Sequence, residues 1–313
     1  MTPGLFVGVA GEGERAIGRE LGIGEARRRL QKHREAFITE ADFRWLATHG
    51  FEAVRIPVGY WLFLEAKGYV SDRRALDCAF EWADRYNLGV VLDMHGLPGS
   101  QNGDDHSGEA GKIRFYRPWH RRTALKALRL AAQQYGSHPR LLGLQIINEP
   151  RSHNRYQFWA LQWYYRRALE MLDPILPHDT KVIVGDAWRP VEIAAFAQRL
   201  PAARRVVLDV HLYRAFDPAD KQLSVDRLID KVGGEWDPLL ASLKQNTSVM
   251  VGEWSAALDP IAYDGVTPMQ RRLLRQRYIH RQQKVFRRHA WLEAYWSYYL
   301  PIGGDWSYRK RRP

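Results

Sequence analysis

Polar side chains that can do acid–base chemistry follow short apolar runs at several places in the chain. Two are glutamates: Glu149 follows the run 142–147, and Glu253 follows the run 248–252. A positioned carboxyl group can donate a proton, accept one or attack an electrophilic carbon. Six further side chains stand at or near the ends of such runs. Each of them alone would more often be a packing residue, so a functional interpretation requires that they meet on one face of the fold. They are Arg55, His95, Asn148, His211, Tyr213 and Trp296.

The apolar runs predict eight strands with helices between them. Near-continuous apolar strands, each followed by a helix, indicate a parallel sheet covered on both faces, and eight such units favour a closed (β/α)8 TIM barrel. No linker interrupts the series, so we expect a single catalytic domain over 1–313, with a short basic tail from about Arg309. The predicted strands are 5–10, 53–57, 89–93, 142–147, 181–185, 205–209, 248–252 and 291–296. The predicted helices are 40–49, 72–87, 119–135, 155–172, 191–200, 236–245 and 269–289.

One motif favours an open nucleotide-binding sheet instead. Gly11, Gly13 and Ala16 spell G-x-G-x-x-A just after a predicted strand. A dinucleotide site also needs a second strand that ends in an acidic residue about 20 positions on. The segment 27–34 is a charged helical stretch instead, so the context argues against a nucleotide site.

In a barrel, the carboxyl ends of the strands meet on one face, which brings the two glutamates to opposite sides of its mouth. Glycosidic cleavage needs such a pair: one carboxyl group protonates the leaving oxygen while the other attacks the anomeric carbon, and a separation of about 5 to 5.5 Å gives retention. We expect Arg55 and Tyr213 to keep one carboxylate ionised, and an apolar aromatic wall to raise the pKa of the other.

Five segments together resemble family 5 of the glycoside hydrolases, in clan A, and within it the exo-β-1,3-glucanase-like branch. The resemblance runs from about Phe37 to Trp306, in the family's order. The segments are Arg-Ile-Pro-Val-Gly-Tyr-Trp at 55–61, Asp-Met-His-Gly-Leu-Pro-Gly-Ser-Gln-Asn-Gly at 93–103, Asn-Glu-Pro at 148–150, His-Leu-Tyr at 211–213 and Val-Gly-Glu-Trp at 251–254.

The resemblance implies that Glu149 is the acid/base and Glu253 the nucleophile. It also implies a shell around the sugar of the −1 subsite, made by Arg55, His95, Asn148, His211, Tyr213 and Trp296. The chemistry of these side chains agrees, because Asn148 can bind the 2-hydroxyl group and Trp296 offers a flat floor under the pyranose.

Two positions depart from the family's pattern. Asp104 stands where relatives carry an aromatic residue of a clamp, while Phe216 fills the second clamp position. A hydrated carboxylate at Asp104 would favour a polar or short leaving group. Phe216 and Trp306 could close one side of the cleft, and a cleft closed on one side predicts exo action. The family's first-strand carboxylate is also absent, and either Glu12 or Glu14 could replace it.

Composition excludes several other classes of protein. Cys78 is the single cysteine, so there is no disulfide framework and no thiolate metal site, and no H-E-x-x-H or G-x-S-x-G motif occurs. We therefore expect neither a metal nor a cofactor. The 47 Lys and Arg against 35 Asp and Glu give a net charge of +12. This charge favours binding to polyanions, but we do not expect that the protein requires a nucleic acid. The chain shows no signal peptide and no membrane span, so we expect a cytoplasmic protein.

The sequence thus predicts a retaining β-glycosidase acting on β-glucosides or short β-glucans. Two alternatives stay open: a transglycosylase on β-glucan, and a non-catalytic barrel that binds glycans or polyanions. The pair Glu149 and Glu253 argues against the binding protein, which would need neither carboxylate. The expected partner is the carbohydrate substrate, and the sequence leaves the oligomeric state open.

Overall fold

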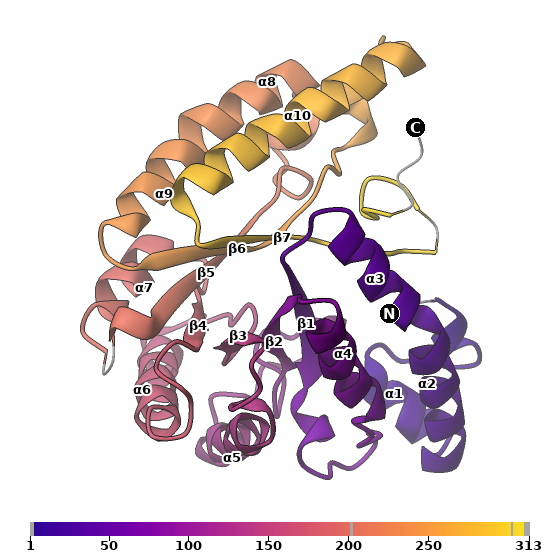
Figure 1. Ribbon diagram of the computed structural model, residues 1–313, viewed down its shortest axis with the longest axis vertical. Helices are drawn as coiled ribbons and strands as arrows, with labels where there is room; N and C mark the ends of the chain where they lie inside the picture. Colours follow the sequence, from indigo (N-terminus) through magenta and orange to yellow (C-terminus); the bar gives the residue numbers. More distant parts are fainter. Residues whose placement is uncertain (1–2, 201–202, 302, 310–313) are drawn as a thin grey trace. The chain divides into compact units, whose positions relative to one another are not determined.

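The computed structural model describes residues 3–200, 203–301 and 303–309, which group into two compact units (Figure 1). The first unit comprises residues 1–188 and 199–206, and the second comprises 189–198 and 207–313. Residues 310–312 of the predicted basic tail lie outside the described residues. Of the helices in the described part, none combines the length and apolarity that crossing a bilayer requires.

The first unit alternates strands and helices. Neighbouring strands pair in parallel in the order β1, β2, β3, β4. The strand β2 is buried along its whole length, as expected for a parallel strand covered on both faces. The strands are β1 (Ala53–Gly59), β2 (Gly89–Gly96), β3 (Leu141–Gln145) and β4 (Lys181–Gly185). The helices are α1 (Glu14–Glu20), α2 (Ile23–Phe37), α3 (Glu40–Thr48), α4 (Arg74–Arg85), α5 (Pro118–Tyr135) and α6 (Arg155–Leu172).

The second unit holds three more parallel strands, paired in the order β5, β6, β7. Its long helix α10 begins with a capping box at Thr267 and Gln270 and has Pro268 in its first turn. The strands are β5 (Val206–Leu212), β6 (Ser248–Trp254) and β7 (Leu292–Tyr295). The helices are α7 (Pro190–Ala197), α8 (Val225–Lys231), α9 (Asp237–Lys244) and α10 (Pro268–His289).

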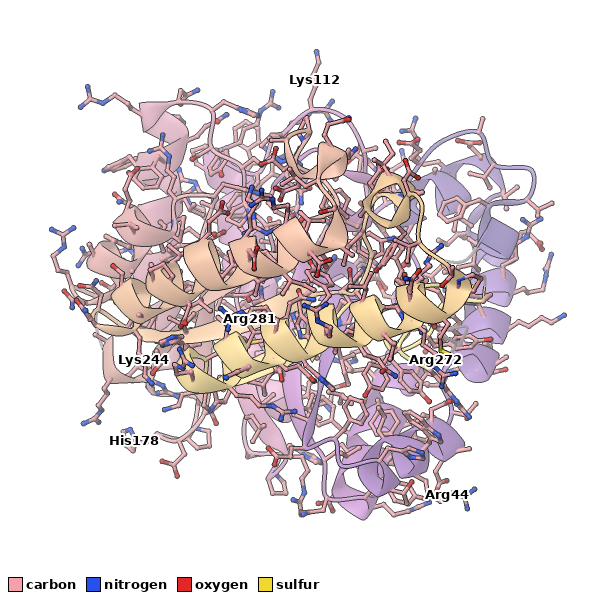
Figure 2. All side chains as sticks on the ribbon, turned by 90° about the horizontal axis from the view of Figure 1, so that it is seen from above. Arg44, Lys112, His178, Lys244, Arg272 and Arg281 are labelled. Atoms are coloured by element: carbon pink, nitrogen blue, oxygen red, sulfur yellow. The ribbon has the colours of Figure 1, made fainter. Side chains whose placement is uncertain are left out.

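Helices α8 and α10 lie side by side over the strands of the second unit (Figure 1). Phe286 of α10 packs against Trp254 of β6, with ring centroids 5.6 Å apart. Because successive residues of a strand point to opposite faces, Glu253 points away from α10. The outer side of these helices is basic: Arg272 of α10 is exposed, as is Lys244 at the end of α9 (Figure 2). Solvated helix faces therefore carry part of the positive charge.

The predicted strand 5–10 is wrong. A short 3-10 helix, Pro3–Phe6, stands at its start, and Gly8 has a φ of 75° that a strand does not accommodate. Leu5 is buried against Ile17, Leu30 and other apolar residues of α1 and α2. Phe6 and Val9 pack against the same small cluster, so this apolar run contacts helices and forms no strand. The described residues consequently contain seven strands where eight were predicted.

The G-x-G-x-x-A motif has a packing role at one of its glycines. Gly13 has a φ of 86° and precedes α1. A β-carbon there would lie 2.7 Å from the carbonyl oxygen of Gly108, which itself accepts a hydrogen bond from the backbone N–H of Arg15. Only glycine fits this close backbone approach.

Candidate active site

Three neighbouring strands of the first unit contribute to one buried polar layer. Arg55 of β1 lies 3.0 Å from the carboxylate of Asp93 on β2, and both side chains are almost fully buried. The Nε of Arg55 also donates to Gln145 Oε1 of β3 at 3.0 Å. A buried guanidinium needs such a combination of charge and hydrogen-bond partners. The layer therefore fixes Arg55 at the carboxyl ends of these strands.

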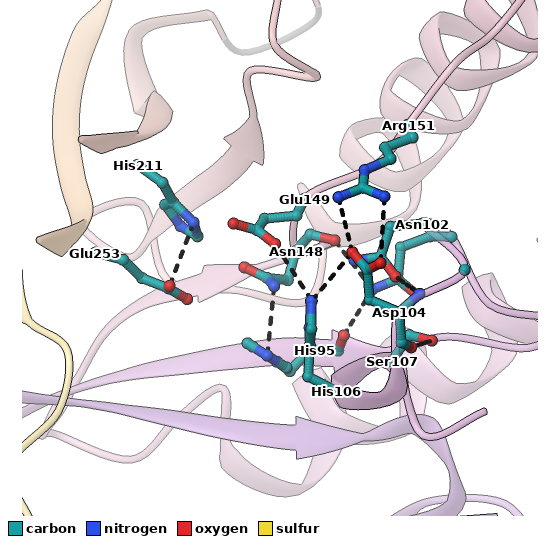
Figure 3. Close-up of polar contacts among 12 residues, drawn as sticks. His95, Asn102, Asp104, His106, Ser107, Asn148, Glu149, Arg151, His211 and Glu253 are labelled. Atoms are coloured by element: carbon teal, nitrogen blue, oxygen red, sulfur yellow. Dashed lines mark hydrogen bonds and ion pairs between the residues drawn. The ribbon is translucent and has the colours of Figure 1, made fainter. Parts of the chain in front are cut away.

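This layer orients His95 and Asn148. His95 Nδ1 lies 2.7 Å from Asp93 Oδ2, so it carries the proton, and Nε2 is left as an acceptor 3.4 Å from Asn148 Nδ2. Asn148 Oδ1 accepts from Arg55 Nη2 at 2.8 Å. The side-chain amide of Gln101, in the loop after β2, donates to the backbone carbonyl oxygens of His95 and Asn148, so it connects this loop with the segment that follows β3. Figure 3 shows the contact between His95 and Asn148.

Glu149 follows Asn148 directly and takes a left-handed backbone conformation, with a φ of 43°. Such a conformation is strained for a residue other than glycine and is concentrated at functional sites. Its Oε2 lies 3.4 Å from Nε2 of His106, which belongs to a short 3-10 helix, Asp105–Ser107, in the loop after β2 (Figure 3).

Asp104, expected as a hydrated carboxylate, is ion-paired, and its side chain remains 32% exposed. Its predicted effect on the leaving group stays a prediction. Arg151 binds both oxygens of Asp104, at 3.2 Å and 3.0 Å, and His106 Nε2 lies 3.5 Å from it. Asp104, His106 and Glu149 offer three possible ligand atoms within 4.8 Å of one another. We assign no metal to them, because the guanidinium of Arg151 already compensates Asp104 and would repel a cation.

In the second unit, Glu253 lies one residue before the end of β6 and is buried, 6% exposed. The hydroxyl of Tyr213 donates to its Oε2 at 2.9 Å, and His211 Nδ1 lies 3.5 Å from the same oxygen (Figure 3 shows the His211 contact). His211 Nε2 is in turn 3.1 Å from Asp209 Oδ2. The carboxylate is thus held in one orientation by groups from β5 and from the loop that follows it. The predicted influence of Arg55 on a catalytic carboxylate stays a prediction.

An aromatic cluster adjoins Tyr213. Phe216 is 62% exposed, and its ring centroid lies 5.3 Å from that of Tyr213 and 5.6 Å from that of Trp306. Trp296 follows β7 and is half-buried, and its backbone N–H donates to the backbone carbonyl oxygen of Trp254. An exposed ring such as that of Phe216 offers a flat apolar face to a ligand.

Of the two candidates for the missing first-strand carboxylate, Glu14 is engaged by protein groups. It accepts from the indole N–H of Trp61 at 2.9 Å and from Arg34 at 3.1 Å. Burial raises the pKa of Glu14 above its ordinary value, an effect that Arg34 opposes. Glu12 is exposed.

Asp93 and Asp209, which orient the two histidines, are functional residues that were not among the predicted site residues. A sequence signal for both exists, since Asp-x-His occurs at 93–95 and again at 209–211. In an extended strand, residues two apart lie on the same face, so the aspartate can reach its histidine. Gln101 and His106 have no comparable signal, because loop geometry alone brings them to their partners.

Sequence comparison finds relatives over most of the chain. The family model described as Cellulase (glycosyl hydrolase family 5) matches residues 24–281. Glucan 1,3-beta-glucosidase 2 of Wickerhamomyces anomalus is 33% identical over 279 residues, which cover 82% of this chain and 62% of that protein. Glucan 1,3-beta-glucosidase of Pichia angusta is 32% identical over 282 residues, covering 84% and 62%. The chain therefore spans about three fifths of the length of these relatives.

Solved structures of similar fold cover most of the chain. Rutinosidase from Aspergillus niger superposes with a TM-score of 0.82 at 18% identity, covering 99% of this chain and 88% of that one. Endo-glycoceramidase II from Rhodococcus sp. gives a TM-score of 0.58 at 20% identity, covering 86% and 70%. These similarities confirm the predicted fold class, the (β/α)8 barrel.

Proposed function

We propose that this chain, which belongs to glycosyl hydrolase family 5, is a retaining β-glycosidase that acts on β-glucosides or short β-1,3-glucans. The observation that carries the proposal is the state of Glu253. It is a buried carboxylate held by Tyr213 and His211 at the end of a strand. A nucleophile that must attack one carbon from one direction needs such a fixed orientation. The names of the relatives support the choice of a β-1,3-glucan.

The proposed reaction proceeds by double displacement. Glu253 attacks the anomeric carbon while Glu149 protonates the departing oxygen, which leaves a glycosyl ester on Glu253. Glu149 then takes a proton from water, whose oxygen attacks the same carbon and releases Glu253. No cofactor is needed, because the two carboxyl groups supply the nucleophile and the proton.

The remaining residues are proposed to bind the sugars. Asn148, fixed by Arg55, would bind the 2-hydroxyl group, where a hydrogen bond strengthens in the transition state. His95 and His211 would orient further hydroxyl groups, and Trp296 would lie under the pyranose ring. Phe216 and Trp306 offer stacking faces for a further sugar or an aglycone.

Hydrolysis of defined oligosaccharides tests this function. We expect the protein to cleave 4-nitrophenyl β-glucoside and to release glucose stepwise from the ends of β-1,3-glucan oligomers, with Glu253→Gln as an inactive control. Products resolved by size over time give the measurement. No hydrolysis of any β-glucoside would contradict the proposed function, and early mid-length fragments would contradict exo action.

A further inference from the structure

His106 lies between two carboxylates of the first unit. Its Nε2 is 3.4 Å from Oε2 of Glu149 and 3.5 Å from Oδ2 of Asp104 (Figure 3). A protonated Nε2 favours the ionised form of a carboxylate at this distance. The family-level mechanism described above assigns no role to this histidine.

Asp104 is held in place. Its carboxylate forms a two-pronged pair with Arg151, at 3.2 Å and 3.0 Å, and its N–H donates to the side chain of Asn102 at 3.0 Å. The guanidinium of Arg151 lies over the ring of Trp188, 5.2 Å from its centroid. Such bidentate pairs fix both distance and plane. Asp104 therefore offers His106 a fixed negative charge.

The 3-10 turn that carries His106 is also fixed. The hydroxyl of Ser107 contacts Ser100 at 2.7 Å and is 2.7 Å from the carbonyl of Asp104. On its other side the imidazole meets the ring of His95, whose centroid is 5.1 Å away. Among the described residues of the first unit, the ionisable groups beside His106 include Asp104 and Asp105 of its own loop, Glu149 of the loop after β3 and His95 of β2. Arg151 acts through Asp104, and Asp93 acts through His95.

We propose that His106 is a positioning residue for Glu149: it donates Nε2–H to the Glu149 carboxylate, and Asp104 with Arg151 fixes the imidazole. The inference rests on the proposed function. When the glycosidic C–O bond breaks, the proton of Glu149 goes to the leaving oxygen, and His106 stabilises the carboxylate that results. When water attacks, its proton returns to Glu149. His106 itself gains and loses no proton.

Kinetics of His106→Ala and His106→Gln test the role in catalysis. Removing the donor raises the pKa of Glu149, so the alkaline limb of kcat/KM for a substrate with a poor leaving group should move up by about 0.5 to 1 pH unit. At the optimum, His106→Ala should reduce that kcat/KM about tenfold. On 2,4-dinitrophenyl β-glucoside, whose leaving group needs no proton, kcat/KM should change less than about twofold. His106→Gln keeps an N–H donor and should restore most of the rate.

The exposed His153 serves as the matched control, and His153→Ala should leave both substrates unaffected. Equal losses on the poor and the good leaving group, or an alkaline limb that does not move, would overturn the proposal. A general failure to fold would lower both rates together and show in the thermal unfolding of the variant.

A titration that needs no turnover separates this proposal from the proposed function. The imidazole signals of His106, followed by NMR in the full chain, should titrate about 0.5 pH unit or more lower in Glu149→Gln and in Asp104→Asn, because each change removes a neighbouring negative charge. The His153 signals should not move. A titration of His106 that is the same in Glu149→Gln would contradict the coupling. If no β-glucoside is cleaved, the function fails, and the titration still decides whether the two groups are coupled.

Discussion

Two histidines of the candidate site each contact an aspartate through one ring nitrogen. In each unit an Asp-x-His segment of a strand puts the carboxylate beside its histidine, Asp93 with His95 and Asp209 with His211. The aspartate determines which nitrogen faces it, and the other nitrogen is presented to Asn148 or to Glu253. The same strand pattern therefore orients groups around both proposed catalytic residues.

The residue types at the strand ends could be predicted, but their pairings could not. Glu149, Glu253 and their neighbours follow apolar runs, which is visible in the sequence. Asp104 pairs with Arg151 and faces His106 because of the path of the loop after β2. A loop path leaves no periodic pattern in the sequence, so these contacts, the ion pair of Asp104 among them, could not be predicted.

Glu293 on β7 gives a prediction about pH and stability. Burial raises its pKa to about 7, although Arg287 lies 3.5 Å away and lowers it. Below pH 4.5, the approximate pKa of this group in the unfolded chain, the carboxyl group is protonated in the folded and in the unfolded protein. Its burial then does not reduce the free energy of unfolding. As the pH rises from 4.5 to 7, the unfolded chain loses this proton first, so the folded protein loses stability.

We therefore expect Glu293→Gln to stabilise the protein by about 2 to 3 kcal/mol at pH 8 and to have little effect at pH 4. Urea unfolding at the two pH values measures this difference. Glu52→Gln, at an exposed glutamate, is the control and should show no such pH dependence. A stabilisation by Glu293→Gln that is equal at both pH values would contradict the explanation.

At the scale of elements, apolar runs located seven of the eight predicted strands, because a strand buried in a parallel sheet has a continuous apolar signature. Residues 181–185 coincide with β4, and the others differ by a few residues at their ends. The run 5–10 has the same local signature, but its side chains pack with α1 and α2. Only these tertiary contacts distinguish the two cases. The short helix α8 was missed, since seven residues give too little periodicity.

The close approach of β5 and β6 at Gly252 leads to a prediction for this pair of strands. A β-carbon at Gly252 would lie 2.1 Å from Oδ1 of Asp209, which orients His211. Gly252→Ala should therefore displace Asp209, destabilise the protein by about 1 to 3 kcal/mol and lower kcat as His211 loses its position beside Glu253.

Thermal unfolding and kcat for an aryl β-glucoside give the measurements. Gly234→Ala is the matched control, because a β-carbon there meets nothing within 4 Å. A Gly252→Ala variant with unaltered unfolding temperature and kcat would show that Asp209 can move without consequence.

At the scale of the whole molecule, the proposed mechanism assigns Glu149, in the first unit, the proton transfers and Glu253, in the second, the covalent step. Family membership and the barrel fold are consistent with this assignment. The net charge of +12 is not needed by the chemistry, and exposed basic residues such as Arg272 and Lys244 lie on the outer helices.

The most direct measurement of the central claim is the identity of the residue that becomes glycosylated. A 2-deoxy-2-fluoro-β-glucoside with a good leaving group should form the ester and hydrolyse slowly, because fluorine at C2 destabilises the oxocarbenium-like transition state of both steps. Mass spectrometry of the digested protein should place one label on Glu253, with no label in Glu253→Gln. A label on another residue, or turnover of β-glucosides with inversion and no covalent intermediate, would contradict the account.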